Sequence, residues 1–141
     1  MPEAETRDAL GLFCEATRAK DADAMLRALA PEAELVSPLS GRMVFRGHDD
    51  LRTLLAAVYG GLTDLTWREV IGEGSTRVAI SEARIAGLPI TDAMVVELDD
   101  TGLIRRLRPH LRPWPAITLF AVMLGPKIAR RPDVVRRALR R

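Results

Sequence analysis

Hydrophobic and polar positions follow two different periods along this chain. In residues 3–20, Leu10, Phe13 and Thr17 recur at three- and four-residue spacing, which predicts an amphipathic helix. Two more helices are predicted at 21–30, opened by Asp21, and at 51–59, ended by a glycine pair. From residue 65 to 113 apolar and polar residues alternate instead, which is typical of strands with two different faces.

Turn residues divide the alternating region into four predicted strands. These strands cover 66–72, 76–86, 92–98 and 103–112, and two short strands are expected earlier, at 34–37 and 42–45. Helices followed by an antiparallel meander predict an α+β domain whose helices lie on one face of a curved sheet.

The last predicted strand carries two contrasting faces. Leu107 and Leu111 alternate with Arg106, Arg108 and two further basic residues. Either the apolar face lines a cavity and the basic face meets solvent, or the reverse holds. A turn at 99–102 would place Glu97 opposite Arg106, and a cross-strand ion pair would then account for part of the basic stripe.

The end of the chain is apolar and then basic. Residues 114–125 predict a helix with little polar surface, ended by Gly125-Pro126 and too short to cross a bilayer. Such a helix could cap a cavity, form a dimer contact or lie on a membrane surface. We therefore divide the chain into a domain at 1–125 and a basic C-terminal extension at 126–141.

Composition and charge narrow the class of protein. With 141 residues, 48% of them hydrophobic, the chain is expected to form one domain with a substantial core. It shows no basic-then-apolar leader and no long apolar run, so we expect a cytoplasmic location. The net charge of +2 conceals an asymmetry, because residues 104–141 hold eleven basic residues and one acid. The single cysteine, Cys14, excludes an internal disulfide and is expected to act as a small buried hydrophobe.

Several segments together resemble a known superfamily. They are Asp21–Pro38, Phe45-Arg-Gly47, Val96–Ile104 and Leu111-Arg-Pro113. In this order they resemble the nuclear transport factor 2-like superfamily, and within it the SnoaL-type polyketide cyclase and ketosteroid isomerase branch. The resemblance implies a cone-shaped barrel in which a curved, mostly antiparallel sheet wraps around three N-terminal helices, with a C-terminal helix added. It also implies an apolar cavity that binds a small molecule without a cofactor, and a homodimer formed through the outer sheet face.

The resemblance also says where the isomerase catalytic residues would fall. The tyrosine of the first helix falls on Phe13, the base aspartate on Ser37, the protonated acid on Met94 and the last aromatic residue on Leu111. None of these side chains can perform the corresponding step of the isomerase mechanism, which needs a carboxylate base and two hydrogen-bond donors. The related cyclases also depend on an acid in the cavity, and none stands at the matched positions.

Three polar residues remain as candidates for catalysis. Ser37 could donate a hydrogen bond, or its hydroxyl could bind the backbone of its own turn. Tyr59 could point its hydroxyl into the pocket, and Asp92 is the only candidate general base unless it is a solvated acid at the start of a strand. The residues expected to line the cavity are Phe13, Met25, Trp67, Ser81, Met94, Val96, Leu107 and Leu111.

The two histidines lie far apart in the sequence. His48 is expected at a helix start, near solvent, and His110 on the outer sheet face, so no metal site is expected. The sequence leaves two functions open. The first is an apolar-cavity protein, either an atypical cyclase or isomerase of natural-product metabolism or a non-catalytic binder. The alternative is an interaction module whose basic tail and outer face bind an acidic partner or, peripherally, an anionic membrane; no sequence-specific nucleic-acid binding is expected.

Overall fold

Three helices precede most of the sheet in the computed structural model, which describes residues 8–40 and 42–140. The helices are α2 (Ala9–Ala19), α3 (Ala22–Arg27) and α4 (His48–Gly60). The carboxylates of Asp8 and Asp21 cap α2 and α3, accepting backbone hydrogen bonds from Gly11 at 2.8 Å and Ala24 at 3.1 Å. All three predicted helices are present, although residues 3–7 of the first lie outside the described part of the chain.

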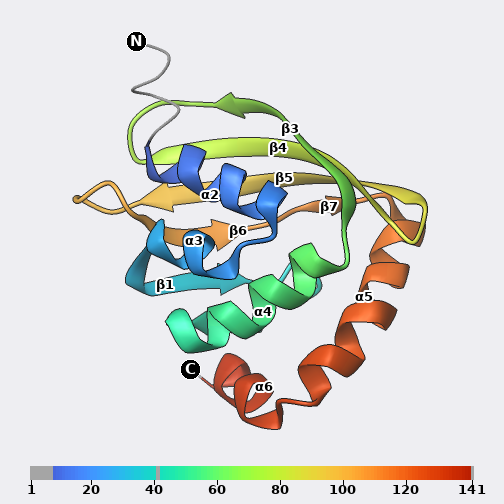
Figure 1. The fold of residues 1–141 in the computed structure, drawn as a ribbon. Helices are drawn as coiled ribbons and strands as arrows, with labels where there is room; N and C mark the ends of the chain where they lie inside the picture. The colour runs from blue at the N-terminus through green and yellow to red at the C-terminus, as the bar shows by residue number, and fades with distance from the viewer. Residues whose placement is uncertain (1–7, 41, 141) are drawn as a thin grey trace.

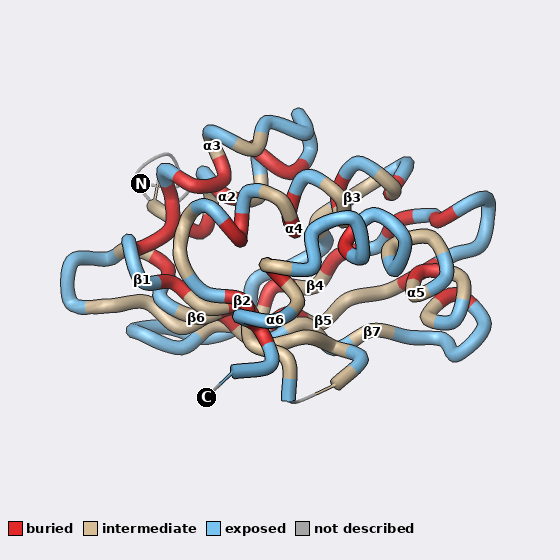
Figure 2. Tube along the Cα trace, turned by 90° about the horizontal axis from the view of Figure 1, so that it is seen from below, coloured by how far each residue is buried: buried red, intermediate tan, exposed pale blue. Residues whose placement is uncertain are grey.

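Seven strands form one curved, open sheet. They are β1 (Leu29–Val36), β2 (Val44–Arg46), β3 (Thr63–Ile71), β4 (Thr76–Ile85), β5 (Leu88–Leu98), β6 (Ile104–Arg108) and β7 (Leu111–Arg112). The order is β2-β1-β6-β5-β4-β3, with β7 paired to β5, and β1 runs parallel to β6 while the other pairs are antiparallel. The helices α2, α3 and α4 cover one face of this sheet (Figures 1 and 2). The predicted α+β cone fold is confirmed.

The two faces of the sheet differ as the alternation predicts. Ala79, Val96 and Leu107 point inward and are fully buried, whereas the side chains of Arg108 and Arg112 are exposed. The predicted register is also confirmed, because Glu97 lies opposite Arg106 in the pairing of β5 with β6. The apolar face of the last strands therefore looks into the core, and the basic face looks outward.

Three strands depart from the sequence prediction, and one of them, β5, begins at Leu88 rather than at residue 92. Strand β1 begins at Leu29 rather than at residue 34 and runs through Pro31, where the register with β6 shifts. Proline lacks an N–H to donate to the ladder, and an irregular stretch tolerates this loss. The predicted strand at 103–112 is divided into β6 and β7 at Pro109 and His110.

The C-terminal region is more ordered than the sequence suggests. Helix α5 (Trp114–Ala129) continues past Gly125-Pro126, so the helix end expected there is wrong. Burial of Ile128 on the far side of the proline offsets the hydrogen bond that Pro126 cannot donate. Helix α6 (Pro132–Leu139) then packs back onto the domain through Val134, which is fully buried.

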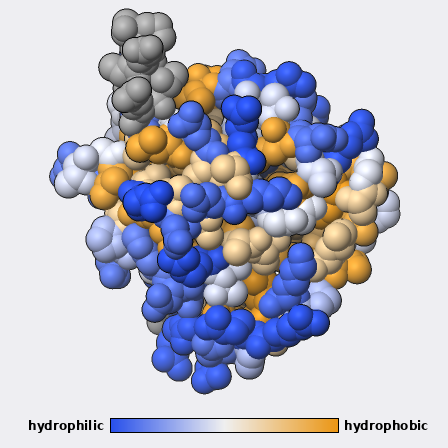
Figure 3. Space-filling view, in the orientation of Figure 1, coloured by the Kyte–Doolittle hydropathy of each residue, from blue (hydrophilic) through white to orange (hydrophobic). Residues whose placement is uncertain are grey.

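The two C-terminal helices have opposite surface character. Apolar atoms gather over α5, whereas charged side chains cover α6 (Figure 3). The guanidinium of Arg137 on α6 donates two hydrogen bonds, at 2.9 and 2.7 Å, to the buried carboxylate of Asp50 at the start of α4. Part of the basic extension is thus anchored to the domain.

Candidate functional site

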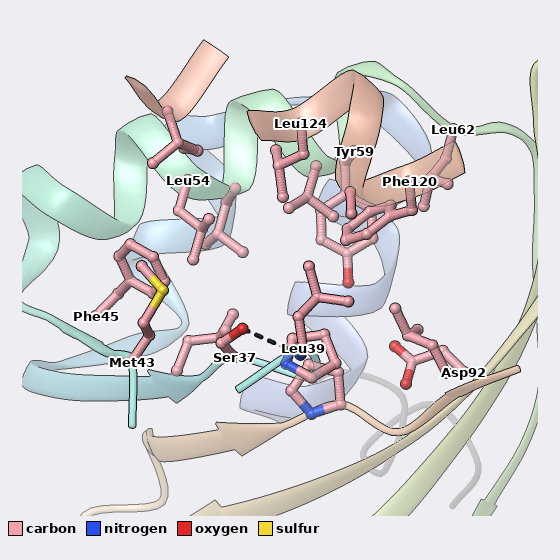
Figure 4. Close-up of a pocket in the computed structure, with 18 of the residues that line it drawn as sticks. Ser37, Leu39, Met43, Phe45, Leu54, Tyr59, Leu62, Asp92, Phe120 and Leu124 are labelled. Atoms are coloured by element: carbon pink, nitrogen blue, oxygen red, sulfur yellow. Dashed lines mark hydrogen bonds between the residues drawn. The ribbon is translucent and has the colours of Figure 1, made fainter. Parts of the chain in front are cut away.

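A cavity of about 280 Å³ lies between the inner face of the sheet and the helices α4, α5 and α6. Most of its wall is made of aliphatic and aromatic side chains, and no lysine, arginine or histidine of residues 8–40 and 42–140 lines it. Figure 4 shows Phe45, Leu54, Phe120 and Leu124 around the space. The apolar wall hydrates a charge poorly, and no basic side chain among the described residues lines the cavity to pair with one, so the cavity favours neutral or weakly polar ligands.

Four polar side chains reach this cavity, namely Ser37, Tyr59, Ser81 and Asp92. They come from the end of β1, the last turn of α4, and the neighbouring strands β4 and β5. Ser81 and Asp92 lie directly opposite each other in the β4–β5 ladder, so both side chains share the inner face. The three residues predicted as catalytic are therefore brought together, with Ser81 beside them.

Asp92 is the most unusual of these groups. Burial raises the pKa of its carboxyl from 3.8 to about 7, although the backbone N–H of His110 opposes the rise by donating a hydrogen bond at 3.1 Å. The turn between β6 and β7 supplies that N–H, so the irregularity at Pro109 and His110 positions the carboxyl. A carboxyl with a pKa near neutrality can both accept and donate a proton under physiological conditions.

Tyr59 directs its hydroxyl into the same space. Its ring is nearly buried and packs edge-to-face on Phe13, with the ring centroids 6.2 Å apart. Burial raises the pKa of the phenol well above its ordinary value, and the nearby carboxyl of Asp92 adds to this rise. The hydroxyl points into the cavity toward the side on which Asp92 lies (Figure 4), and it makes no hydrogen bond with any residue that the structure describes. It is a neutral donor.

The hydroxyl of Ser37 takes part in a hydrogen bond within its own turn. Its hydroxyl oxygen accepts a hydrogen bond from the backbone N–H of Leu39 at 3.1 Å, which leaves the hydroxyl proton available to the cavity. Ser81 is buried, and its hydroxyl has no hydrogen-bond partner within the described ranges. Ser81 therefore offers a second unoccupied polar group next to Asp92.

The residues that the sequence assigns to the cavity wall lie at two different ends of the inner face. Ser81, Met94 and Leu111 line the cavity, but five other predicted residues do not, namely Phe13, Met25, Trp67, Val96 and Leu107. Four of these are completely buried in the core, because side chains of α2 and α3 fill that end of the inner face. Trp67 packs against the core edge and donates its indole N–H to the hydroxyl of Thr17 at 2.9 Å.

Sequence reasoning missed the part of the wall that follows residue 112. Phe120, Leu124 and Ile128 of α5, with Val135 of α6, close the cavity from the side opposite the sheet. The apolar pattern of residues 114–125 allowed a cavity cap among other roles. The contribution of α6 had no comparable signal, because its apolar residues are interleaved with arginines.

The remaining candidate groups have structural roles. His48 donates its Nε2–H between the carbonyl oxygens of Leu29 and Ala30, at 3.2 and 3.1 Å, and so joins α4 to β1. Burial, aided by the charges of Asp8 and Glu15, raises the pKa of the Cys14 thiol to about 12, so this thiol is not a nucleophile. In residues 8–40 and 42–140, no cluster of three or more acidic, histidine or cysteine side chains is placed to hold a metal ion.

Helix length in the described part of the chain also bears on membrane topology. No helix there has both the length and the apolar composition needed to cross a bilayer.

Comparison with known proteins places this geometry in a family. A family model described as the SnoaL-like domain matches residues 11–107. No curated protein sequence matches the chain. Among solved structures, the fold is similar to that of an uncharacterized protein with a cystatin-like fold from Silicibacter pomeroyi, with 17% identity and a TM-score of 0.85 over 92% of this chain and 93% of that one.

Two other similar structures carry functional descriptions. A steroid delta-isomerase from Pseudomonas aeruginosa matches with 19% identity and a TM-score of 0.79 over 89% of this chain and 92% of that one. SalBIII, an epoxide hydrolase/cyclase-like enzyme of pyran ring formation in the polyether salinomycin, matches with 14% identity and a TM-score of 0.65 over 81% and 95%. At these identities the likeness shows the fold alone. The family model covers more than half of the chain, so this protein belongs to the SnoaL-like family of the nuclear transport factor 2-like superfamily.

Proposed function

We propose that this protein binds an apolar small molecule in the cavity and catalyses an isomerisation or cyclisation in which Asp92 transfers a proton. The observation that carries the proposal is a carboxyl with a pKa near 7 inside an apolar cavity that no basic side chain lines. The family and the isomerase- and cyclase-like structural neighbours are consistent with this reaction class.

In this mechanism the ligand is held with its reacting group between β5 and the end of α4. The ionised Asp92 would remove a proton from carbon next to a carbonyl, and Tyr59 or Ser37 would donate a hydrogen bond to the oxygen on which negative charge develops. The protonated Asp92 would then return the proton at a second position. The apolar wall would hold the ligand in a reactive conformer.

This assignment differs from the isomerase arrangement in the position of the base. The base position implied by resemblance falls on Ser37 of the β1 end, whereas the proposed proton carrier stands on β5. The position of the tyrosine differs as well, because the donor comes from α4 instead of the first helix. We therefore propose a similar reaction class carried out by different residues.

A deuterium-exchange experiment tests the proposal. Apolar ketones that native mass spectrometry shows to bind are incubated with the protein in deuterated water, and exchange at the adjacent carbon is followed by NMR. Asp92→Asn, which keeps the acceptor for His110, should lower the exchange rate about 100-fold or more. The exposed Asp100→Asn serves as a matched control that should leave it unchanged. Full exchange in Asp92→Asn, or the absence of any bound ketone, would rule the proposal out.

The alternative, a non-catalytic interaction module, has less support from the charges. Among the arginines of the tail, Arg137 bonds Asp50 and Arg131 bonds Asp133. On the outer face, Glu97 contacts three arginines. These ion pairs occupy part of the basic surface on which the alternative depends.

We also propose that the protein forms a homodimer through the outer sheet face. Val78, Ile80 and Val95 form a half-buried apolar strip there, since Val78 pairs with Val95 across β4 and β5. Ile80→Asp should reduce the mass measured by light scattering from dimer to monomer, whereas Asp100→Asn should not change it.

A further inference from the structure

Helix α5 is apolar apart from the exposed Thr118 and Lys127, although one of its sides faces solvent. Its outward residues include Trp114, which is 77% exposed, and Val122, which is 63% exposed. A helix that is hydrophobic all round is ordinarily covered on all sides. The inward side of α5 meets the cavity and α4, so only its outward side remains uncovered (Figures 1 and 3).

Positive charge borders this apolar side at both ends. Arg112 precedes the helix, Lys127 lies in its last turn and Arg130 follows it, and all three side chains are exposed. None of the three has an ion-pair partner among the residues that the structure describes. The sequence contains no acid between residues 104 and 132, so this segment contributes positive charge only.

We propose that the outward face of α5 docks on an anionic lipid membrane, lying parallel to its surface. The face combines an apolar stripe, a tryptophan at one end and basic residues at both ends, which is the arrangement that favours the boundary between headgroups and acyl chains. The sequence left both the apolar helix at 114–125 and the basic tail open as membrane contacts. In the structure α6 packs on the domain, and α5 is the helix that presents apolar side chains.

A second copy of this chain is a less suitable occupant. In a two-fold contact through α5, Lys127 and Arg130 would lie close either to the same residues of the second copy or, with the helices antiparallel, to its Arg112, and like charges at an interface are unfavourable in both cases. An anionic bilayer has the opposite charge and is fluid enough to surround Trp114 and Val122. The inner side of the same helix lines the cavity, so a ligand that partitions into lipid would meet the protein at the cavity wall.

Vesicle sedimentation with the full chain tests this inference. We expect the protein to sediment at low ionic strength with phosphatidylcholine vesicles that contain a quarter of phosphatidylglycerol, and much less with phosphatidylcholine alone. Val122→Glu should lower the partition coefficient about tenfold or more, because it removes an apolar contact with the bilayer and adds a negative charge. Leu12→Glu is the matched control, since Leu12 is an exposed apolar residue of another helix, at 48%.

Charge and fluorescence give independent readouts. The double variant K127Q/R130Q should weaken binding about fivefold for each charge removed, whereas R18Q/R27Q on α2 and α3 should have little effect. Brominated lipids should quench the fluorescence of the wild type, and Trp114→Phe should abolish most of this quenching. Thermal unfolding of each variant checks that its fold is retained.

Three results would overturn the inference. The first is wild-type protein that stays in the supernatant with anionic vesicles at low ionic strength. The second is Val122→Glu binding as tightly as Leu12→Glu. The third is a wild-type self-association, measured without lipid, that Val122→Glu abolishes, because a second copy would then be the occupant of α5.

Discussion

Two carboxyl groups on opposite faces of one sheet have opposite properties. Asp92 faces inward from β5, has no basic side chain as a partner among the described residues, and has a pKa raised to about 7 by burial. Glu34 faces outward from β1 and bonds Arg46 at 2.8 Å and Arg106 at 3.3 Å. Burial alone would raise the pKa of Glu34, but the hydrogen bond and charge of Arg46, together with Arg106, hold it below its ordinary value.

The difference shows that a strand can place a reactive side chain on one face of the sheet and stabilising side chains on the other. Successive side chains of a strand point to opposite faces, so neighbours in sequence can have very different surroundings. On the outer face, charges are paired and exposed, and they stabilise the fold a little. On the inner face, one unpaired carboxyl weakens the fold at neutral pH, and the same destabilisation makes it reactive.

The largest expected effect concerns the pH dependence of stability. The folded protein holds a proton on Asp92 up to a pH of about 7, whereas the unfolded chain loses it near 3.8. The free energy of unfolding should therefore fall as pH rises through this window, by about 1.4 kcal/mol per pH unit, and stay low above it. Asp92→Asn should remove this slope and be more stable than the wild type at pH 8, as measured by urea denaturation.

Glu34 provides a control, because its contribution to the free energy of unfolding changes with pH in the opposite direction. Because its pKa is lowered in the folded state, its contribution to stability is present above the ordinary value of 4.5 and is lost as the pH falls. Glu34→Gln should therefore cost stability at neutral pH and little in acid. A difference between wild type and Asp92→Asn that does not change with pH would contradict the comparison.

A smaller effect on the free energy of unfolding distinguishes Met94 from Val95, which are neighbours on β5. Met94 is 2% exposed and faces inward, whereas Val95 is half-buried on the outer face. Met94→Ala should lower the free energy of unfolding by about 2–3 kcal/mol, since it removes buried contacts and enlarges the cavity. Val95→Ala should cost less than about 1 kcal/mol. If thermal denaturation showed the same loss of unfolding free energy for both variants, the outer face would be covered as fully as the inner one.

The smallest effect concerns the ion pairs of the outer face. Glu97 lies 2.6 Å from Arg105, 3.4 Å from Arg106 and 3.6 Å from Arg108. Glu97→Gln should cost about 1 kcal/mol at low salt, because the three arginine side chains are 37–48% exposed and water weakens their attraction to the carboxylate. The loss should shrink as salt is added, and urea denaturation at two ionic strengths measures it. A loss independent of salt would point to packing of the Glu97 side chain instead.

Local patterns were enough to predict the parts of this structure that depend on near neighbours. The inward and outward faces of the strands and the pairing of Glu97 with Arg106 follow from alternation and turn position. The family resemblance added the curved sheet around the helices, and the SnoaL-like match confirms it. Ser37, Tyr59 and Asp92 were also predicted to share the cavity wall.

What depends on distant packing could not be predicted in this way. The extension of α5 beyond Pro126 results from burial of Ile128, which no local rule reports. The position of α6 depends on Arg137 and Asp50, which are 87 residues apart in the sequence. The raised pKa of Asp92 results from the surrounding apolar wall, and its lining includes side chains of α4, α5 and α6.

The parallel pairing of β1 with β6 has a consequence for the order of folding. It joins Leu29 to Ile104. The intervening segment, roughly half of the protein, must therefore close into a loop before these two strands can pair. Contacts of such long sequence separation tend to form late and to slow folding. Leu35 of β1 lines the cavity opposite residues of β5, so the cavity is completed only when this pairing is made. Refolding followed through a cavity-bound fluorescent probe should therefore lag behind the formation of helices.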